Sequence, residues 1–246
     1  MATYVLVHGS WQGGWIWKPV ASKLQAAGHL VYHPTLDGCA ERAHALRKDI
    51  TLDTQGGEIA GLLFYEDLTD VILVGTSSGG IVVARAAELA RERIRRLVFV
   101  DALVPRPGET ASIINGRPAR EANDLASGFQ PDEVAEHAFP GLEPAVRAWA
   151  VARYTRHPRA PTEEPVDLRA FWSQKWQVDV LRGSHSARPP EAHQHRTAEM
   201  LGGSYSEINA GHYPTLSNVD ELADYLLDKA RATADTEAGA AAGARP

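Results

Sequence analysis

Cysteine and long hydrophobic runs are what this sequence has least of. Cys39 is the only cysteine among 246 residues, so no disulfide can form within the chain and a reducing cytoplasm is the expected location. No stretch approaches the roughly 18 apolar residues of a membrane-spanning helix. The N-terminus has no basic region followed by an apolar run, so no signal peptide is expected.

The sequence also lacks a dominant charge and a set of metal ligands. Its formal net charge is −6, with both signs spread along the chain, which argues against nucleic acid or a membrane as partner. The histidines lack metal-ligand spacing, and no glycine-rich motif that would cradle a phosphate is present. We therefore expect no cofactor and a small-molecule substrate, with a homodimer left open.

Apolar runs alternate with helical patterns along most of the chain. Hydrophobic residues make up 44% of the sequence, which is ample for a core. Strand-like runs occur at residues 3–8, 30–34, 71–74, 95–102, 178–183 and 204–209. Helical patterns lie between most of them, at residues 17–27, 53–65, 81–90 and 190–201. This alternation predicts an α/β fold with a mostly parallel, doubly wound sheet.

The rhythm breaks between residues 105 and 176. Prolines are frequent there, and short helical patterns lie between them at residues 131–138, 143–154 and 166–176. We interpret this segment as a helical cap inserted into a core formed by residues 1–104 and 177–231. Residues 232–246 are rich in alanine and glycine without periodicity, which predicts a disordered tail.

One stretch, Val71 to Gly80, carries the strongest chemical signal. Four apolar residues are followed by Gly-Thr-Ser-Ser-Gly and then by a helical pattern. A G-x-S-x-G turn between a strand and a helix presents its serine as a nucleophile on a sharp turn, and Gly75 and Gly79 leave room for it. The central residue, Ser77, is the predicted nucleophile. The alternative is an ordinary strand–helix turn with incidental serines.

A serine hydroxyl needs a base to take its proton. His212 follows Gly211 in a loop between the last strand-like run and the final helical pattern. Most histidines lie on surfaces or in cores, but this position suits a catalytic base. We predict that His212 activates Ser77.

These motifs together resemble a known family. They are Val7-His8-Gly9-Ser10-Trp11 with Gly14-Trp15, the Gly75–Gly79 turn, Val100-Asp101-Ala102-Leu103-Val104-Pro105, and Gly211-His212. The chain resembles the small α/β-hydrolases of the plant methylesterase and hydroxynitrile lyase group and their bacterial esterase relatives. The resemblance implies an α/β-hydrolase fold with a nucleophile, an acid and a histidine in that order along the chain.

The negative charge of an acyl-transfer intermediate needs N–H donors aimed at it. The N–H of Ser78 opens the helix after the nucleophile, where the helix dipole also favours an anion. A second N–H is expected from Ser10, which follows His8-Gly9. The alternative is that residues 8–10 form only a tight strand exit, with Trp11 as core or pocket wall.

The acid is harder to place. In the resembling group it usually follows the strand that here spans residues 178–183, yet residues 182–190 contain no Asp or Glu. The position implied by the resemblance is occupied by His185. Asp179 lies inside the strand, too early, and Glu191 opens the next helix, too late.

Asp101 is the remaining candidate. It ends the strand after the nucleophile's helix, at the carboxyl edge of the sheet where ligand groups gather. Some α/β-hydrolases, cofactor-free dioxygenases among them, carry the acid there. We predict that Asp101 orients His212. The alternative is that Asp101 only caps the loop before Pro105.

Aromatic residues in the predicted cap point to the substrate. Trp149 and Trp172, together with Trp11 and His185, are the predicted substrate-binding residues, and an aromatic lid suggests a small apolar or aromatic ester or lactone. The alternatives are that the tryptophans only hold the cap on the sheet and that His185 is exposed to solvent.

Ester hydrolysis through an acyl-enzyme is the predicted function, and the alternatives are a lyase, a cofactor-free dioxygenase and a non-catalytic binding protein. Plant hydroxynitrile lyases carry a threonine where this chain has Gly9 and a lysine where it has Tyr213. Cofactor-free dioxygenases often carry a histidine where it has Ser78. A non-catalytic ligand-binding protein on this fold usually loses a member of the triad, whereas Ser77 and His212 are both present.

Overall fold

The computed structural model describes residues 1–118 and 124–243, and its centre is a six-stranded sheet. The strand order is β2-β1-β3-β4-β7-β8, and every neighbouring pair is parallel. This confirms the predicted doubly wound α/β fold. The strands are β1 (Thr3–Val7), β2 (Leu30–Tyr32), β3 (Val71–Thr76), β4 (Ile94–Val100), β7 (Val178–Gly183) and β8 (Ser204–Ile208).

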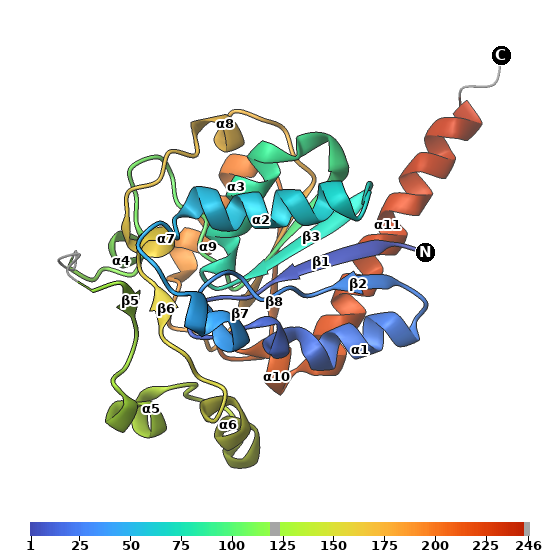
Figure 1. Cartoon of the computed structure of the whole chain (residues 1–246). Coiled ribbons are helices and arrows are strands. Elements are labelled where there is room, and N and C mark those ends of the chain that lie inside the picture. The colour runs from blue at the N-terminus through green and yellow to red at the C-terminus, as the bar shows by residue number, and fades with distance from the viewer. Residues whose placement is uncertain (119–123, 244–246) are drawn as a thin grey trace.

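Helices cover both faces of the sheet (Figure 1). One face packs against α2 (Leu52–Tyr65), α3 (Gly79–Leu89) and α9 (Glu191–Leu201). The other face packs against α1 (Lys18–Ala26), α10 (Pro214–Ser217) and α11 (Val219–Gly243). Short 3₁₀ helices lie at η1 (Gly14–Trp17), η2 (Ala40–Ala45) and η3 (Arg91–Arg93).

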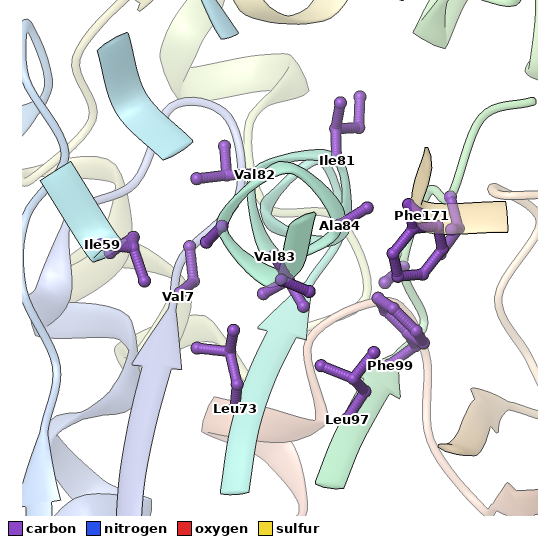
Figure 2. Close-up of a cluster of buried hydrophobic side chains, with 14 of the residues drawn as sticks. Val7, Ile59, Leu73, Ile81, Val82, Val83, Ala84, Leu97, Phe99 and Phe171 are labelled. Atoms are coloured by element: carbon purple, nitrogen blue, oxygen red, sulfur yellow. The ribbon is translucent and has the colours of Figure 1, made fainter. Parts of the chain in front are cut away.

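Strand β3 begins with four apolar residues, Val71 to Val74, because both of its faces are buried. Leu73 of β3 packs under α3, and Figure 2 shows Val83 of that helix above the strand ends, between Leu73 and Leu97. The next residue, Val74, belongs to the cluster on the opposite face. A continuous run of β-branched and leucine residues is what a parallel strand covered on both sides requires.

The chain between β4 and β7, residues 105–176, is here called the connecting segment. Its described residues form short elements: α4 (Ala111–Ile114), α5 (Pro131–His137), α6 (Pro144–Val151), α7 (Ala160–Glu163), α8 (Arg169–Trp172) and an antiparallel pair, β5 (Ala126–Ser127) with β6 (His157–Pro158). Residues 119–123 lie outside the described residues.

The helix predicted at residues 166–176 is reduced to the single turn of α8. The indole Nε1 of Trp176 donates to the carbonyl oxygen of Phe171 at 2.9 Å, which is the acceptor that a continuing helix would use. The two rings stack with centroids 5.5 Å apart. Burial of these rings against the core therefore replaces the next helical turn.

Helix α11 continues to Gly243, whereas the sequence predicts a disordered tail from residue 232. Alanine has the highest helix propensity of all residues, so an alanine-rich stretch extends the helix without needing an apolar period. Residues 244–246 of the predicted tail lie outside the described residues. Within the described part of the chain, no helix combines the length and the apolar character needed to cross a membrane.

Candidate active site

The predicted site residues meet at the carboxyl edge of the parallel sheet. Ser77 follows β3, Asp101 follows β4, and His212 lies in the loop after β8. The chain leaves β1 toward β2 on one side, and β3 pairs with β1 on the other. Ligands of such sheets bind in the crevice at this switch in strand order.

Ser77 sits on a strained turn between β3 and α3. Its φ is +52°, in the left-handed region that non-glycine residues rarely adopt. The turn needs a residue without a side chain two positions later, because a Cβ on Gly79 would lie 2.5 Å from the carbonyl oxygen of His8. This is the geometry that the G-x-S-x-G pattern predicts for an exposed nucleophile.

A continuous chain of hydrogen bonds joins the three predicted catalytic residues. His212 Nε2 is 3.0 Å from Ser77 Oγ, and His212 Nδ1 is 2.5 Å from Asp101 Oδ2. A carboxylate only accepts, so Nδ1 carries the proton and Nε2 accepts from the serine hydroxyl. The side chain of Asp101 is completely buried, whereas that of His212 is 23% exposed, so the imidazole reaches the open side of the site.

Asp101 receives two further hydrogen bonds that the sequence did not reveal. Ser186 Oγ donates to Oδ2 at 2.5 Å, and the N–H of Gly183 donates to Oδ1 at 3.2 Å. The backbone of Asp101 also has a positive φ of +45°. Donors on both oxygens compensate the cost of burying a charged carboxylate.

The two other carboxylates considered for the acid are engaged elsewhere. Asp179 forms ion pairs with Arg96 and, at 2.9 Å, with Lys229. Glu191 lies 3.4 Å from Arg182 at the start of α9. Both therefore serve ion pairs around β7.

The loop after β1 is fixed by the neutral side chain of His8. Its Nδ1 donates to the carbonyl oxygen of Gly9 at 2.8 Å, and its Nε2 accepts from the N–H of Leu36 at 3.0 Å. Burial lowers the pKa of His8 to about 4, which suits a ring nitrogen that must accept. The N–H of Gly9 in turn donates to Gln12 Oε1 at 3.0 Å.

This loop lies directly against the serine. A Cβ on Gly9 would be 2.6 Å from Ser77 Cβ and 3.1 Å from Ser77 Oγ. The hydroxyls of Ser10 and Ser78 are 2.7 Å apart, so the two predicted oxyanion donors come from adjacent backbone segments. Ser78 is also the N-cap of α3, where the helix dipole favours negative charge.

Trp11 links this loop to the connecting segment. Its Nε1 donates to the carbonyl oxygen of Ser127 at 3.2 Å, and its ring lies 5.6 Å from Phe129 and 6.4 Å from Tyr154. Phe129 and Tyr154 line a cavity of about 400 Å³ between α5 and α6, with Pro131, Val134, Ala135, Val151, Thr155 and Arg156.

Three predicted substrate-binding residues have their contacts elsewhere. Trp149 packs edge-on against Trp15 at 5.3 Å. Trp172 packs against Phe171 at 5.5 Å and donates to the carbonyl oxygen of Pro105 at 2.8 Å. His185 is exposed, with its Nε2 2.8 Å from Asn209 Oδ1. Of the four, Trp11 is the one that directly follows Ser10 in the loop against Ser77.

Cys39 is a further reactive group in the described part of the chain. Cys39 Sγ lies 3.4 Å from His157 Nδ1, but burial raises the pKa of the thiol to about 12, so it is not a nucleophile at neutral pH. In the part of the chain that the structure describes, no cluster of three or more His, Cys, Asp or Glu residues could hold a metal ion.

Comparison with protein families places these features in a wider context. A family model described as "Alpha/beta hydrolase family" matches residues 4–225. A carbendazim hydrolyzing esterase from Nocardioides sp. is 39% identical over 139 residues, covering 56% of this chain and 57% of that protein.

Two plant proteins match more weakly. An alpha-hydroxynitrile lyase from Arabidopsis thaliana is 35% identical over 103 residues, covering 42% of this chain and 40% of that protein. Methyl jasmonate esterase 1 from Vitis vinifera is 35% identical over 114 residues, covering 45% and 43%. The matched part of the chain thus spans about half the length of these relatives.

Solved structures agree with this chain over most of its length. An extracellular alpha/beta-hydrolase from a Paenibacillus species has a TM-score of 0.80 at 23% identity and covers 93% of this chain and 98% of that one. A methylesterase from Arabidopsis has a TM-score of 0.73 at 19% identity and covers 94% and 99%. At these identities the likeness concerns the fold.

Proposed function

The chain belongs to the alpha/beta hydrolase family, and from that premise we propose that it is a serine esterase. In this proposal it cleaves a small apolar or aromatic carboxylic ester, or a lactone, through an acyl-enzyme. The observation that carries the proposal is the chain of hydrogen bonds from Ser77 through His212 to the buried Asp101.

Acylation begins with proton transfer from Ser77 Oγ to His212 Nε2 as Oγ attacks the carbonyl carbon of the ester. The bond from Oγ to carbon forms and the electron pair of the carbonyl moves onto its oxygen. Asp101 stabilises the imidazolium that results. The short hydrogen bond to Nδ1 keeps the ring in the tautomer that accepts at Nε2.

The backbone N–H groups of Ser10 and Ser78 stabilise the oxyanion. They lie on adjacent segments beside Ser77, and fixed donors of this kind need no reorganisation as charge develops. Collapse of the intermediate breaks the bond to the alcohol oxygen, which takes the proton from His212 Nε2. Water activated by the same histidine then releases the acid from Ser77.

The connecting segment supports an apolar substrate. Trp11 packs on Phe129 and Tyr154, which line the cavity between α5 and α6. Concave apolar surfaces of this size suit small organic ligands. Esterases among the named relatives, such as the carbendazim hydrolyzing esterase and methyl jasmonate esterase 1, are consistent with this substrate class.

Lyase chemistry has less support, although one relative is named a hydroxynitrile lyase. The plant lyases carry a threonine at the position of Gly9, and here even a Cβ would lie 2.6 Å from Ser77 Cβ. They carry a lysine after the histidine, where this chain has Tyr213, whose buried ring packs 5.2 Å from Phe139. A cation at that position would lack this packing.

The proposal is tested with p-nitrophenyl acetate and butyrate in the presence and absence of a fluorophosphonate. The wild-type protein should turn over at least one ester, and mass spectrometry should find the label on Ser77. Ser77→Ala should abolish both, whereas Ser22→Ala, on the exposed side of α1, should change neither. Absence of both turnover and label in the wild type would instead indicate a ligand-binding protein or, if oxygen is consumed, an oxygenase.

A further inference from the structure

Ser186 is a buried serine that contacts the acid of the site. Its Oγ lies 2.5 Å from Asp101 Oδ2, and the same oxygen lies 2.5 Å from His212 Nδ1. One carboxylate oxygen therefore accepts from two donors. We propose that Ser186 is a positioning residue, whose hydroxyl fixes the Asp101 carboxylate and shares the charge of Oδ2 with the His212 hydrogen bond.

The single hydroxyl proton of Ser186 has two acceptors within reach. One is Asp101 Oδ2 at 2.5 Å, and the other is the carbonyl oxygen of Arg188 at 3.0 Å. Hydrogen bonds to charged acceptors are shorter and about twice as strong as those to neutral ones. The hydroxyl proton therefore points to the carboxylate. Because Asp101 is completely buried, this hydrogen bond takes the place of one that an exposed carboxylate would accept from water.

The turn that carries Ser186 is held in place from several sides. The N–H of Ser186 donates to the carbonyl oxygen of Gly183 at 2.9 Å, and the carbonyl oxygen of Ser186 accepts from Arg182 Nη2 at 3.3 Å. Arg182 is anchored in turn by Glu207 at 2.8 Å. Because these contacts do not involve the hydroxyl, its removal should leave the turn intact.

The same turn lies against the loop that delivers the histidine. A Cβ on Gly183 would be 2.4 Å from the carbonyl oxygen of Gly211, the residue before His212. The end of β7 thus sets the position of both the acid and the base. Ser186 is the side chain through which this turn contacts the carboxylate.

Loss of the hydroxyl has two consequences for the hydrogen bond between Asp101 and His212. The carboxylate loses one of the donors that fix its rotation, and Oδ2 becomes a stronger acceptor for the remaining donor. Ser186→Ala should therefore strengthen the Nδ1 hydrogen bond while making its geometry less defined. Since Ser186 does not touch the substrate, kcat should fall about 10- to 100-fold with little change in KM.

The test is the low-field proton NMR signal of His212 Nδ1–H, assigned by its loss in His212→Ala. In Ser186→Ala this signal should move further downfield, and Ser186→Thr, which keeps a hydroxyl, should return it toward the wild-type position. Ser184→Ala removes a hydroxyl from the same turn without touching Asp101, so it should leave the signal in place. An unchanged signal in folded Ser186→Ala would overturn the inference.

The predicted fall in kcat rests on the proposed function, whereas the NMR signal does not. If the wild-type protein hydrolyses no ester, the proposed function fails, and the signal still decides the role of Ser186. If the wild type is active and Ser186→Ala keeps its full kcat, the hydroxyl has no positioning role. A loss of thermal stability without a change in the signal would also contradict the inference, because it would show a role in folding alone.

Discussion

The edge of the sheet and the connecting segment are built in different ways. At the edge, backbone hydrogen bonds join the ends of neighbouring strands. The N–H of Asp101 donates to the carbonyl oxygen of Leu181 at 2.7 Å, and the N–H of Leu103 donates to the carbonyl oxygen of Ser77 at 2.8 Å. In the connecting segment, α5 and α6 span seven and eight residues, and β5 and β6 span two residues each. Two of its contacts with loops at the sheet edge are made by aromatic rings, Phe129 against Trp11 and Phe139 against Tyr213.

This contrast implies that the sheet edge carries out the chemistry and that the connecting segment selects the substrate. Atoms fixed by parallel strands keep the sub-ångström geometry that acyl transfer needs, whereas the rings of Phe129 and Tyr154 lie outside the six-stranded sheet. We therefore expect substitutions at the edge to act on kcat for every substrate. Substitutions in the connecting segment should act on KM and on the choice of substrate.

The largest loss is expected at Asp101. Asp101→Asn keeps the shape of the side chain but replaces the negative charge with an amide. The tautomer of His212 with its proton on Nδ1 is then no longer favoured, and the imidazolium is no longer stabilised. We predict a fall in kcat of about 10⁴-fold. Glu191→Gln, which removes a carboxylate that pairs with Arg182, should change kcat by less than about twofold. Steady-state kinetics with p-nitrophenyl esters measures both, and comparable losses would remove the distinction between the two acids.

The next effect is expected at Gly9. A methyl group there would lie 2.6 Å from Ser77 Cβ, so Gly9→Ala should displace the Ser10 N–H from the oxyanion and lower kcat about 10²- to 10³-fold. Gly57→Ala on α2, where a Cβ meets no atom within 4 Å, is the matched control and should retain full activity. Gly9→Ala with wild-type kcat would show that this loop does not supply a donor.

Acid should destabilise both regions, because burial lowers the pKa of His8 at the edge to about 4 and that of His157 in the connecting segment to about 3. Burial lowers the pKa of His8 from 6.5 to about 4, so the unfolded chain binds the proton more readily. The stability that depends on neutral His8 is complete above about pH 6.5 and is lost as the pH falls toward 4, by roughly 3 kcal/mol.

Urea titrations at several pH values measure this loss. His8→Gln should be less stable than the wild type at pH 7 and should lose less on acidification. His137→Gln, in the exposed part of α5, should lose as much as the wild type. If His8→Gln shows the same pH dependence as the wild type, His8 is not the group responsible.

The smallest effect is expected at Phe129. Phe129→Ala opens the cavity between α5 and α6 and removes the ring that packs on Trp11. KM for a bulky ester should rise about 10-fold, with kcat nearly unchanged, because apolar burial of the substrate is lost. Phe64→Ala on α2, where the ring is 61% exposed, should leave KM unchanged. A fall in kcat equal to the rise in KM would place Phe129 at the reacting atoms.

The strands, the turn that carries Ser77 and the grouping of Ser77 with His212 and Asp101 could be predicted from the sequence. Each depends on a local pattern: a buried strand, a turn that needs glycine at 79, and a residue that directly follows a strand. Parallel strands then bring such residues to one edge without further information. This is why Asp101 could be proposed although the usual acid position is occupied by His185.

Contacts between distant segments could not be predicted in the same way. Ser186 and Gly183 support Asp101 through hydrogen bonds that span more than 80 residues and that no local spacing encodes. The contacts of His185 with Asn209 and of Trp172 with the carbonyl oxygen of Pro105 likewise join residues far apart in the sequence. Aromatic composition alone does not tell pocket wall from core packing.

The most direct test of these separate roles is the ratio of the kcat/KM values for p-nitrophenyl acetate and butyrate. It is measured in Asp101→Asn, in Phe129→Ala and in the double variant. Asp101→Asn should lower both values by the same large factor and leave the ratio at its wild-type value. Phe129→Ala should change the ratio, and the double variant should show the product of the two effects. A changed ratio in Asp101→Asn, or an unchanged ratio with equal losses in Phe129→Ala, would contradict the assignment of chemistry to the sheet edge and selection to the connecting segment.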